Sequence, residues 1–438
     1  MSFAPLVLAL ALVAGRPPQE GVAPAPGPRA ADTLVVVGAD GPVRTLAEAV
    51  RRAAPGARIV VRPGVYREPT VEVDRRVRIE GEVGAVLDGE NERGLLLVTA
   101  DDVRISGLEL RNVGVSFVED RAAIEVRGGN RCTIEGNRIE NAFFGIYLAG
   151  SEGCVIRDNV IVGNSRRESR SGNGIHVWYS RGVTVEGNLV RGHRDGIYFE
   201  FVEDGLVTGN RSEENLRYGL HFMFSDRCRY EENEFLRNGA GVAVMYTTGV
   251  VMRGNRFEDS HGSASFGLLL KDITDSEIRG NVFRRNTVGI HAEGFDRTRV
   301  EENDFVENGR AVRLLANSEA SVFSRNNFVD NTFDVTTNSR RIHSAFRANY
   351  WDGYRGYDLG RDGIGDVEHR PVRLFALVVE STPEATVLLR SFFATLLDWT
   401  ERLVPSLTPG NLVDPAPAMR RLDRGDAGRV GRAAGTES

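Results

Sequence analysis

Short alternations of apolar and polar residues, each preceded by glycine, recur along most of the chain. The alternation is seen in Gly145-Ile-Tyr-Leu, Gly174-Ile-His-Val, Gly196-Ile-Tyr-Phe, Gly219-Leu-His-Phe, Gly241-Val-Ala-Val and Gly289-Ile-His-Ala. Runs of period two that are bounded by Gly and Asn predict β-strands separated by turns. A helical repeat would need apolar stripes of period 3.6 over ten or more residues, and the repeated part of the chain contains none.

An asparagine marks the same point of each repeat, at intervals of 22 to 29 residues. These residues are Asn137, Asn159, Asn188, Asn210, Asn233, Asn255, Asn281, Asn303, Asn326 and Asn349. Stacked Asn side chains can form hydrogen-bonded ladders, and both Asn and Gly tolerate left-handed backbone at corners. The pattern predicts an all-β fold, a single-stranded parallel β-helix with one turn of the coil per repeat. Parallel crossovers favour a right-handed coil.

The segments around the repeats divide the chain into four parts. Residues 1–31 combine an apolar run with a Pro/Ala-rich stretch and predict a signal peptide and leader, and therefore export to the periplasm. Residues 32–349 are predicted to form the β-helix, with a short capping helix within Thr45–Gly56. Residues 350–419 are predicted to form a C-terminal cap and docking tail, and the Arg/Gly-rich residues 420–438 a disordered tail.

The alternation also predicts which side chains point out of the coil. One outward column contains Tyr147, His176, Tyr198, His221, Ala243, Leu269, His291 and Arg313. The next contains Ala149, Trp178, Glu200, Met223, Met245, Lys271, Glu293 and Leu315. An exposed strip of aromatic and apolar residues usually marks an interaction surface. We refer to these two columns as the outer strip.

The outer strip contains a candidate metal site at His221, Met223 and Met245. The two methionines occupy the same column on successive turns, ~4.8 Å apart, and His221 lies on the same side of the strand as Met223. Imidazole and thioether ligands together suit Cu(I) better than hard cations, so we predict transient copper binding. The alternative is that the strip packs beneath a covering loop or a partner protein.

Composition excludes several classes of protein. A net charge of −6 provides no basic surface for nucleic acid. The three cysteines, Cys132, Cys154 and Cys228, are too few for a disulfide framework. Each lies five residues before a repeated Asn, in a column shared with valines, which predicts buried free thiols. Cys132 and Cys154 would lie on neighbouring turns, so a metal-binding or redox pair is the alternative.

Two resemblances add to this picture. The opening segment Thr45–Tyr66 resembles the start of the pectate-lyase-like superfamily of β-helix proteins. The segments Arg217–Ser225, Gly239–Tyr246, Asn349–Asp366 and Leu396–Met419 resemble the NosD family. That resemblance implies a non-enzymatic periplasmic accessory protein of nitrous oxide reductase maturation. Its implied partners are the reductase, a copper chaperone lipoprotein, and the membrane subunit of an ABC transporter with its cytoplasmic ATPase, which would hold the protein peripherally at the inner membrane.

The tail contains two further candidate features. Asp358, Asp362 and Asp366 stand at positions one, five and nine of a calcium-loop pattern, but position three is Gly360 and position twelve is His369. The segment is therefore a degenerate calcium loop or a glycine-rich turn that caps the coil. Apolar residues between Pro383 and Pro405 predict an amphipathic helix, either packed on the open end of the coil or docked on the transporter.

Two other classes of function compete with the accessory role. A carbohydrate-active lyase, epimerase or hydrolase would need clustered carboxylates on one outer face. Asp195, Glu200, Glu203 and Asp204 gather near two turns with Arg194, but the sequence repeats no acidic column. A purely structural solenoid is the second alternative. The fold alone decides between none of these.

Overall fold

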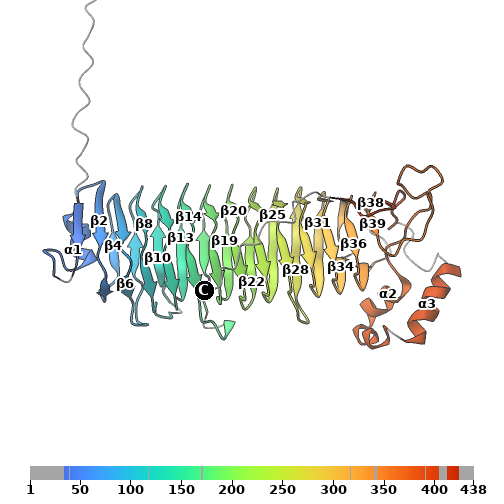
Figure 1. Ribbon diagram of the computed structural model, residues 1–438, viewed down its shortest axis with the longest axis horizontal. Helices are drawn as coiled ribbons and strands as arrows, with labels where there is room; N and C mark the ends of the chain where they lie inside the picture. The colour runs from blue at the N-terminus through green and yellow to red at the C-terminus, as the bar shows by residue number, and fades with distance from the viewer. Residues whose placement is uncertain are drawn as a thin grey trace, which may run out of the picture.

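The computed structural model describes residues 34–38, 40–116, 118–168, 171–315, 317–339, 343–389, 391–403 and 412–423. Over these residues the chain winds into one elongated right-handed parallel β-helix (Figure 1), which confirms the predicted fold. The predicted signal peptide and leader, residues 1–31, lie outside the described residues, as do residues 424–438 of the predicted disordered tail.

Three parallel sheets run along the coil, and each turn contributes one strand to each sheet. The first sheet contains β1 (Leu34–Val37), β2 (Ala57–Val61), β5 (Val77–Gly81), β8 (Arg104–Ser106), β11 (Thr133–Glu135), β14 (Val155–Arg157), β17 (Thr184–Glu186), β20 (Leu206–Thr208), β23 (Arg229–Glu231), β26 (Val251–Arg253), β29 (Glu277–Arg279), β32 (Arg299–Glu301), β35 (Glu319–Ser324) and β38 (His343–Arg347). The second contains β3 (Gly64–Tyr66), β6 (Ala85–Asp88), β9 (Glu109–Arg111), β12 (Arg138–Glu140), β15 (Val160–Val162), β18 (Leu189–Arg191), β21 (Arg211–Glu213), β24 (Glu234–Leu236), β27 (Arg256–Glu258), β30 (Val282–Arg284), β33 (Asp304–Val306), β36 (Asn327–Val329) and β39 (Tyr350–Trp351). The third contains β4 (Val71–Val73), β7 (Leu96–Val98), β10 (Ala122–Arg127), β13 (Phe144–Ala149), β16 (Ile175–Trp178), β19 (Asp195–Glu200), β22 (Tyr218–Met223), β25 (Ala240–Thr248), β28 (Phe266–Thr274), β31 (Val288–Asp296), β34 (Arg310–Leu314) and β37 (Phe333–Thr337).

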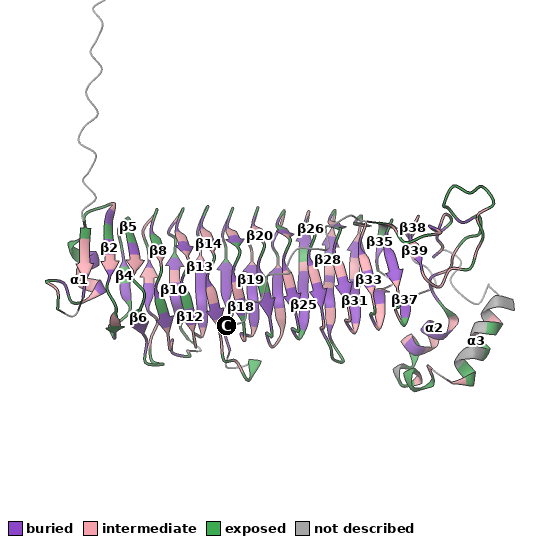
Figure 2. Ribbon diagram, viewed as in Figure 1, coloured by how far each residue is buried: buried purple, intermediate pink, exposed green. Residues whose placement is uncertain are grey.

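The interior of the coil is a continuous apolar core, shown by the purple strands of Figure 2. The two predicted inward columns of the third sheet are completely buried, as Ile197 and Phe199 illustrate on β19. Rings from the second sheet also stack along the axis; Phe257 and Phe283, for example, have centroids 4.6 Å apart. Burial of these side chains supplies the main driving force for the fold.

The repeated asparagines form the predicted ladder at the corner between the first and second sheets. Each side chain from Asn137 to Asn326 donates from Nδ2 to Oδ1 of the next asparagine, as in the 3.0 Å contact from Asn159 to Asn188. The same oxygen accepts the backbone N–H of the preceding asparagine. Buried amides are thereby satisfied at every turn, so each turn depends on its neighbours.

The glycine before each apolar alternation is required by close backbone approach. A Cβ atom at Gly145 would lie 2.4 Å from the carbonyl oxygen of Gly174 on the next turn, and one at Gly241 would lie 2.4 Å from that of Gly267. Any side chain there would push neighbouring turns apart, because real Cβ atoms do not come this close to backbone oxygen. The glycine column thus permits the tight spacing of the third sheet.

A short helix covers the first turns of the coil, as predicted. Helix α1 (Leu46–Arg52) begins after Thr45, whose hydroxyl accepts the backbone N–H of Glu48 at 3.2 Å. The Glu68 carboxylate accepts two more backbone N–H groups of the first helical turn, from Leu46 and Ala47. The apolar face of α1 is buried against the core.

The C-terminal region differs from the single long helix that was predicted. Helix α2 (Leu374–Ser381) packs on β37, with the Phe333 and Phe375 rings 6.2 Å apart. A 3₁₀-helix (Pro383–Leu388) follows, and α3 begins only at Phe392 and ends at Leu403. Pro383 has no N–H to continue α2, so the chain breaks there and starts again. Helix α2 therefore covers the side of the coil at β37. The sequence pattern did not indicate this helix.

The chain returns to the last turn of the coil at residues 412–423. Asp414 is completely buried and accepts hydrogen bonds from the backbone and side-chain amides of Asn349 and from the indole of Trp351. A carboxylate thus takes the place of the next asparagine and ends the ladder. Leu422 continues the attachment by exchanging hydrogen bonds with the Asn327 amide.

Candidate functional site

The three predicted copper ligands lie on the outer face of the third sheet. Register places Tyr198, His221 and Ala243 side by side on β19, β22 and β25, and likewise Glu200, Met223 and Met245. Because Leu220 and Phe222 point into the core, His221 and Met223 lie on the same outward side of β22. The strand alternation therefore brings one imidazole and two thioethers to one place on the surface of the coil.

The ring column of the outer strip is buried, which corrects the expectation of an exposed strip. Tyr147, His176, Tyr198 and His221 follow one another along four turns with ring centroids 4.5–4.9 Å apart, and each is at most 9% exposed. Tyr198 and His221 stack face to face, whereas Tyr147 and His176 meet edge to face. The spacing between parallel strands lies within the range of centroid separations at which aromatic rings pack, so neighbouring rings shield one another from solvent. Tyr218 flanks His221 as well, with ring centroids 5.0 Å apart.

His221 is buried with unpaired ring nitrogens, as is the completely buried His193. Neither of the ring nitrogens of His221 has a hydrogen-bond partner, and Nδ1 lies 3.8 Å from Oδ2 of Asp195. Burial lowers the pKa of the neighbouring His176 to about 3, and the charge of Arg194 adds to this effect. The His176 imidazole is therefore neutral at neutral pH. Both ring nitrogens of His221 are left without a hydrogen-bond partner. Buried polar atoms without partners call for a ligand or another explanation.

Asp195 and Arg217 form an ion pair next to His221. Asp195 is completely buried, and its carboxylate accepts hydrogen bonds from Nε and Nη2 of Arg217. Burial favours the protonated acid, but Arg217 and the facing His221 outweigh it and hold the pKa of Asp195 at about 2. The carboxylate therefore stays ionised across the physiological range. The sequence pattern placed Asp195 in an acidic cluster but did not identify Arg217 as its ion-pair partner.

Met223 and Met245 are half-buried. The hydroxyl of Tyr198 donates to Sδ of Met223 at 3.6 Å, and Met223 pairs in register with Met245. Across the described residues, no three His, Cys, Asp or Glu side chains converge on a metal position. A metal site on this face would therefore depend on thioether sulfur, which selects soft ions such as Cu(I).

A second row of rings, missed in the sequence, lies next to the methionines. Tyr179, Phe201, Phe224 and Tyr246 stack along four turns with centroids 4.6–5.1 Å apart, and we name them the aromatic row. Each follows directly after a residue of the outer strip. Tyr179, Phe201 and Phe224 come just after the end of a strand, whereas Tyr246 lies within β25. The recurrence of an aromatic residue at this position on four successive turns is the sequence signal that could have predicted the row.

The predicted acidic cluster separates into unrelated groups. Asp195 is buried and paired with Arg217, while the half-buried Glu203 and the exposed Asp204 form ion pairs with Arg181 and Arg227. Carboxylates engaged in this way do not face one another across a substrate position. This geometry gives no support to general acid–base chemistry at the cluster.

The cysteines are buried free thiols, as predicted. Cys132 donates its backbone N–H to Sγ of Cys154 at 3.3 Å, so the two lie on neighbouring turns inside the coil. The thiol of Cys154 and burial together raise the pKa of Cys132, and burial raises that of Cys228 to about 12. Cys132 and Cys228 therefore stay protonated, a state that disfavours metal ligation.

The degenerate calcium loop is a structured turn. Asp358 accepts the backbone N–H groups of Asp362 and Gly363, and Asp366 accepts that of Leu359. The carboxylates are thus used to hold the turn itself, and the prediction of calcium has no support here. The turn attaches to the returning tail, since Gly365 donates to the carbonyl of Pro417.

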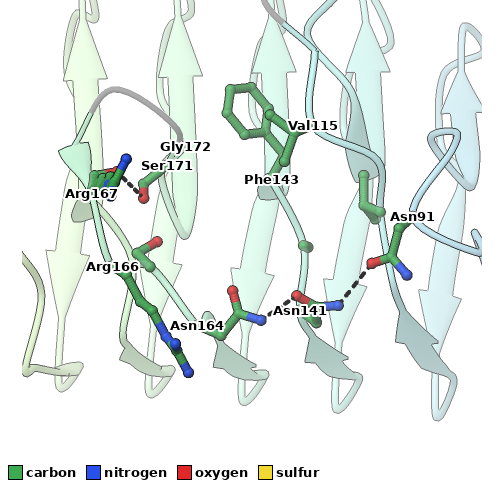
Figure 3. A pocket seen from close by; sticks show the side chains of 12 residues that line it. Asn91, Val115, Asn141, Phe143, Asn164, Arg166, Arg167, Ser171 and Gly172 are labelled. Atoms are coloured by element: carbon green, nitrogen blue, oxygen red, sulfur yellow. Dashed lines mark hydrogen bonds between the residues drawn. The ribbon is translucent and has the colours of Figure 1, made fainter.

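A cavity of about 600 Å³ lies further toward the N-terminus, lined by residues between Asn91 and Gly172. Figure 3 shows Phe143 on one side of it and the hydrogen-bonded amides of Asn91, Asn141 and Asn164 on the other. The described lining residues include no Asp, Glu or His. This cavity has a polar surface but none of the titratable groups that acid–base catalysis uses.

Two solved structures are similar in fold to this chain. The catalytic unit of an α-1,3-glucanase from Streptomyces thermodiastaticus matches with a TM-score of 0.52 and 16% identity, over 76% of this chain and 68% of that one. A mannuronan C-5 epimerase module from Azotobacter vinelandii matches with a TM-score of 0.50 and 15% identity, over 67% and 90%. At this identity the likeness establishes the fold alone.

Sequence comparisons are more specific. A curated protein of Pseudomonas aeruginosa, named a probable ABC transporter binding protein NosD, is 33% identical over 369 residues, covering 80% of this chain and 85% of the relative. A protein of the same name from Stutzerimonas stutzeri is 29% identical over 370 residues, covering 80% and 84%. The family model described as "Periplasmic copper-binding protein (NosD)" matches residues 76–169 and 165–357, more than half of the chain. The chain therefore belongs to the NosD family.

Proposed function

We propose that this protein is a periplasmic accessory factor in nitrous oxide reductase maturation, which carries Cu(I) toward the copper–sulfide centre. Support comes from the family's description as periplasmic and copper-binding, and from relatives named for binding an ABC transporter. In this role the protein binds and positions its cargo and partners, a copper chaperone and the reductase among them, and catalyses no reaction.

The observation that carries the proposal is the arrangement of His221, Met223 and Met245. His221 has buried ring nitrogens without hydrogen-bond partners, and two thioethers lie next to it on the same outer face. Copper is the cargo here, so the ligands must also release it. Few ligands and half-buried methionines suit transfer better than a closed cage does.

Replacing both sulfur atoms is expected to weaken Cu(I) binding at least tenfold. Met223→Leu/Met245→Leu keeps side-chain size and apolarity but removes the soft ligands, and His221 alone binds Cu(I) weakly. The affinity is measured by competition against a chromophoric Cu(I) chelator. Met252→Leu is the matched control, because Met252 is completely buried inside the first sheet. Equal affinity in the double variant and the wild type would remove the copper site and leave partner packing as the role of this face.

We further propose that α3 docks on the membrane subunit of the transporter, which holds the protein at the inner membrane. Phe392 is 81% exposed and Trp399 is 66% exposed, on a helix that the coil does not need as a cover because α2 packs on β37. Exposed aromatic and apolar residues of this density mark interaction surfaces. No helix among the described residues has the length and apolar character that crossing a bilayer requires.

A further inference from the structure

The aromatic row is built at a conformational cost. Its four residues have positive φ angles of 44–57°, a backbone conformation that bulky side chains rarely adopt. On other turns the same corner is formed by Gly128, Gly150, Asp272 and Gly294, which tolerate this conformation more readily. Stacking between the rings offsets part of the cost, but Tyr179 is still 56% exposed, and Phe224 and Tyr246 are 40% and 39% exposed. Such a strained and exposed row indicates a binding surface.

The two ends of the row differ. At one end, the Lys271 ammonium lies 6.0 Å from the centroid of the Tyr246 ring. At the other end, the turn before Tyr179 carries only Ala149 and Gly150, whose strand pairs with the strand of Trp178. A Cβ atom at Gly150 would have nothing within 4 Å. The row therefore ends in open space beside Tyr179.

This space is a shallow pocket of about 370 Å³ in front of Tyr179 and Gly150. Its rim includes Glu152, Arg181 and Glu203, which follow one another on three successive turns. Arg181 pairs with Glu203, whereas the exposed Glu152 carboxylate has no ion-pair partner among the described residues. The pocket thus combines an aromatic ring with a free acceptor and with guanidinium N–H donors.

We propose that this pocket binds a neutral pyranose sugar, stacked on Tyr179 and hydrogen-bonded to Glu152 and Arg181. The C–H face of a sugar ring carries partial positive charge and packs on the negative face of an aromatic ring. Its hydroxyls both donate and accept, which matches a rim with one carboxylate acceptor and one guanidinium donor. An anionic ligand would be repelled by Glu152 and Glu203. The proposal is independent of copper binding at Met223 and Met245.

The test is calorimetric titration of the full chain with maltotetraose, cellotetraose and chitotetraose. We expect saturable binding of at least one of them in the millimolar range, and at least tenfold weaker binding for Tyr179→Ala. Gly150→Asn is a second variant, because Asn tolerates the left-handed backbone and its side chain fills the space beside the ring. It should also lose at least tenfold while keeping Tyr179. Tyr246→Ala, at the opposite end of the row, should bind with the wild-type affinity.

Three results would overturn the proposal. The first is that none of the three oligosaccharides, titrated to about 10 mM, gives a binding heat that saturates; this concentration is high enough to detect millimolar dissociation constants. The second is an equal loss of affinity in Tyr246→Ala, which would mean that the row acts only through stability. The third is preferential binding of tetramethylammonium chloride, with the same dependence on Tyr179, which would identify a cation site instead. Thermal melts show whether each variant is folded. If Tyr179→Ala does not fold, the affinity of Gly150→Asn decides the test.

Discussion

Ile197→Asp is expected to unfold the coil around β19 and to lower the free energy of unfolding by about 4 kcal/mol or more. Ile197 is completely buried in the core, so the new carboxylate would have neither water nor a partner. Because each turn is stabilised by its neighbours, the damage should spread along the solenoid. Thermal unfolding followed by circular dichroism measures the change.

Val65→Asp provides the matched control for this substitution. Val65 lies on β3 but points outward and is 45% exposed, so the same new charge should cost no more than about 0.5 kcal/mol. A wild-type melting curve for Ile197→Asp would contradict the inward assignment of the column. A large effect in Val65→Asp would show that any added charge destabilises the coil.

The second large effect is expected in the tail. Phe392→Ser/Trp399→Ser should abolish co-purification with the membrane subunit of the transporter, because the two side chains provide the most exposed large rings of α3. The melting temperature should stay unchanged, since neither ring packs on the coil. Pull-down from detergent-solubilised membranes, with both proteins co-expressed, measures the association. Val83→Ser, at a 97% exposed position near the other end of the coil, should retain the partner.

Point substitutions are required because removal of the whole tail would confuse two effects. Asp414 closes the asparagine ladder, and Leu422 bonds to Asn327, so truncation before Pro383 would also open the last turn. Retained co-purification of the double variant would rule out docking through α3. Lost co-purification together with a lower melting temperature would place the defect in folding instead.

The sequence predicted the coil because its periodic constraints are local. The asparagine ladder and the inward columns follow from one repeated geometry, and both were confirmed in place. The expected left-handed backbone was wrong for the ladder asparagines and for the glycine before each strand: it falls on other corner residues such as Gly136, and the repeated glycines permit close backbone approach instead. Helix α1 was also predicted, because its cap at Thr45 and its apolar face are local signals. Helix α2 was missed because its apolar run becomes a helix through contact with Phe333, a residue of the distant β37.

The candidate site was predicted only in part. Register alone placed His221 beside Met223 and Met245, but it could not show that flat rings on neighbouring turns cover one another. The pairing of Asp195 with Arg217 depends on side-chain reach across turns, which alternation does not encode. The aromatic row was missed because its residues have left-handed backbone, which falls outside the strand alternation that the sequence pattern follows.

Strict register between turns makes the coil a spacer with a countable length. From β25, which carries Met245, the third sheet continues through β28, β31 and β34 to β37, where α2 is attached. At ~4.8 Å per step, the methionine pair is held about 19 Å along the axis from that attachment. A cargo at Met245 would then be presented at a constant height above a docked membrane partner. Deleting one whole repeat between these strands would lower it by about 5 Å, so under the proposed function the number of turns would set the height of delivery.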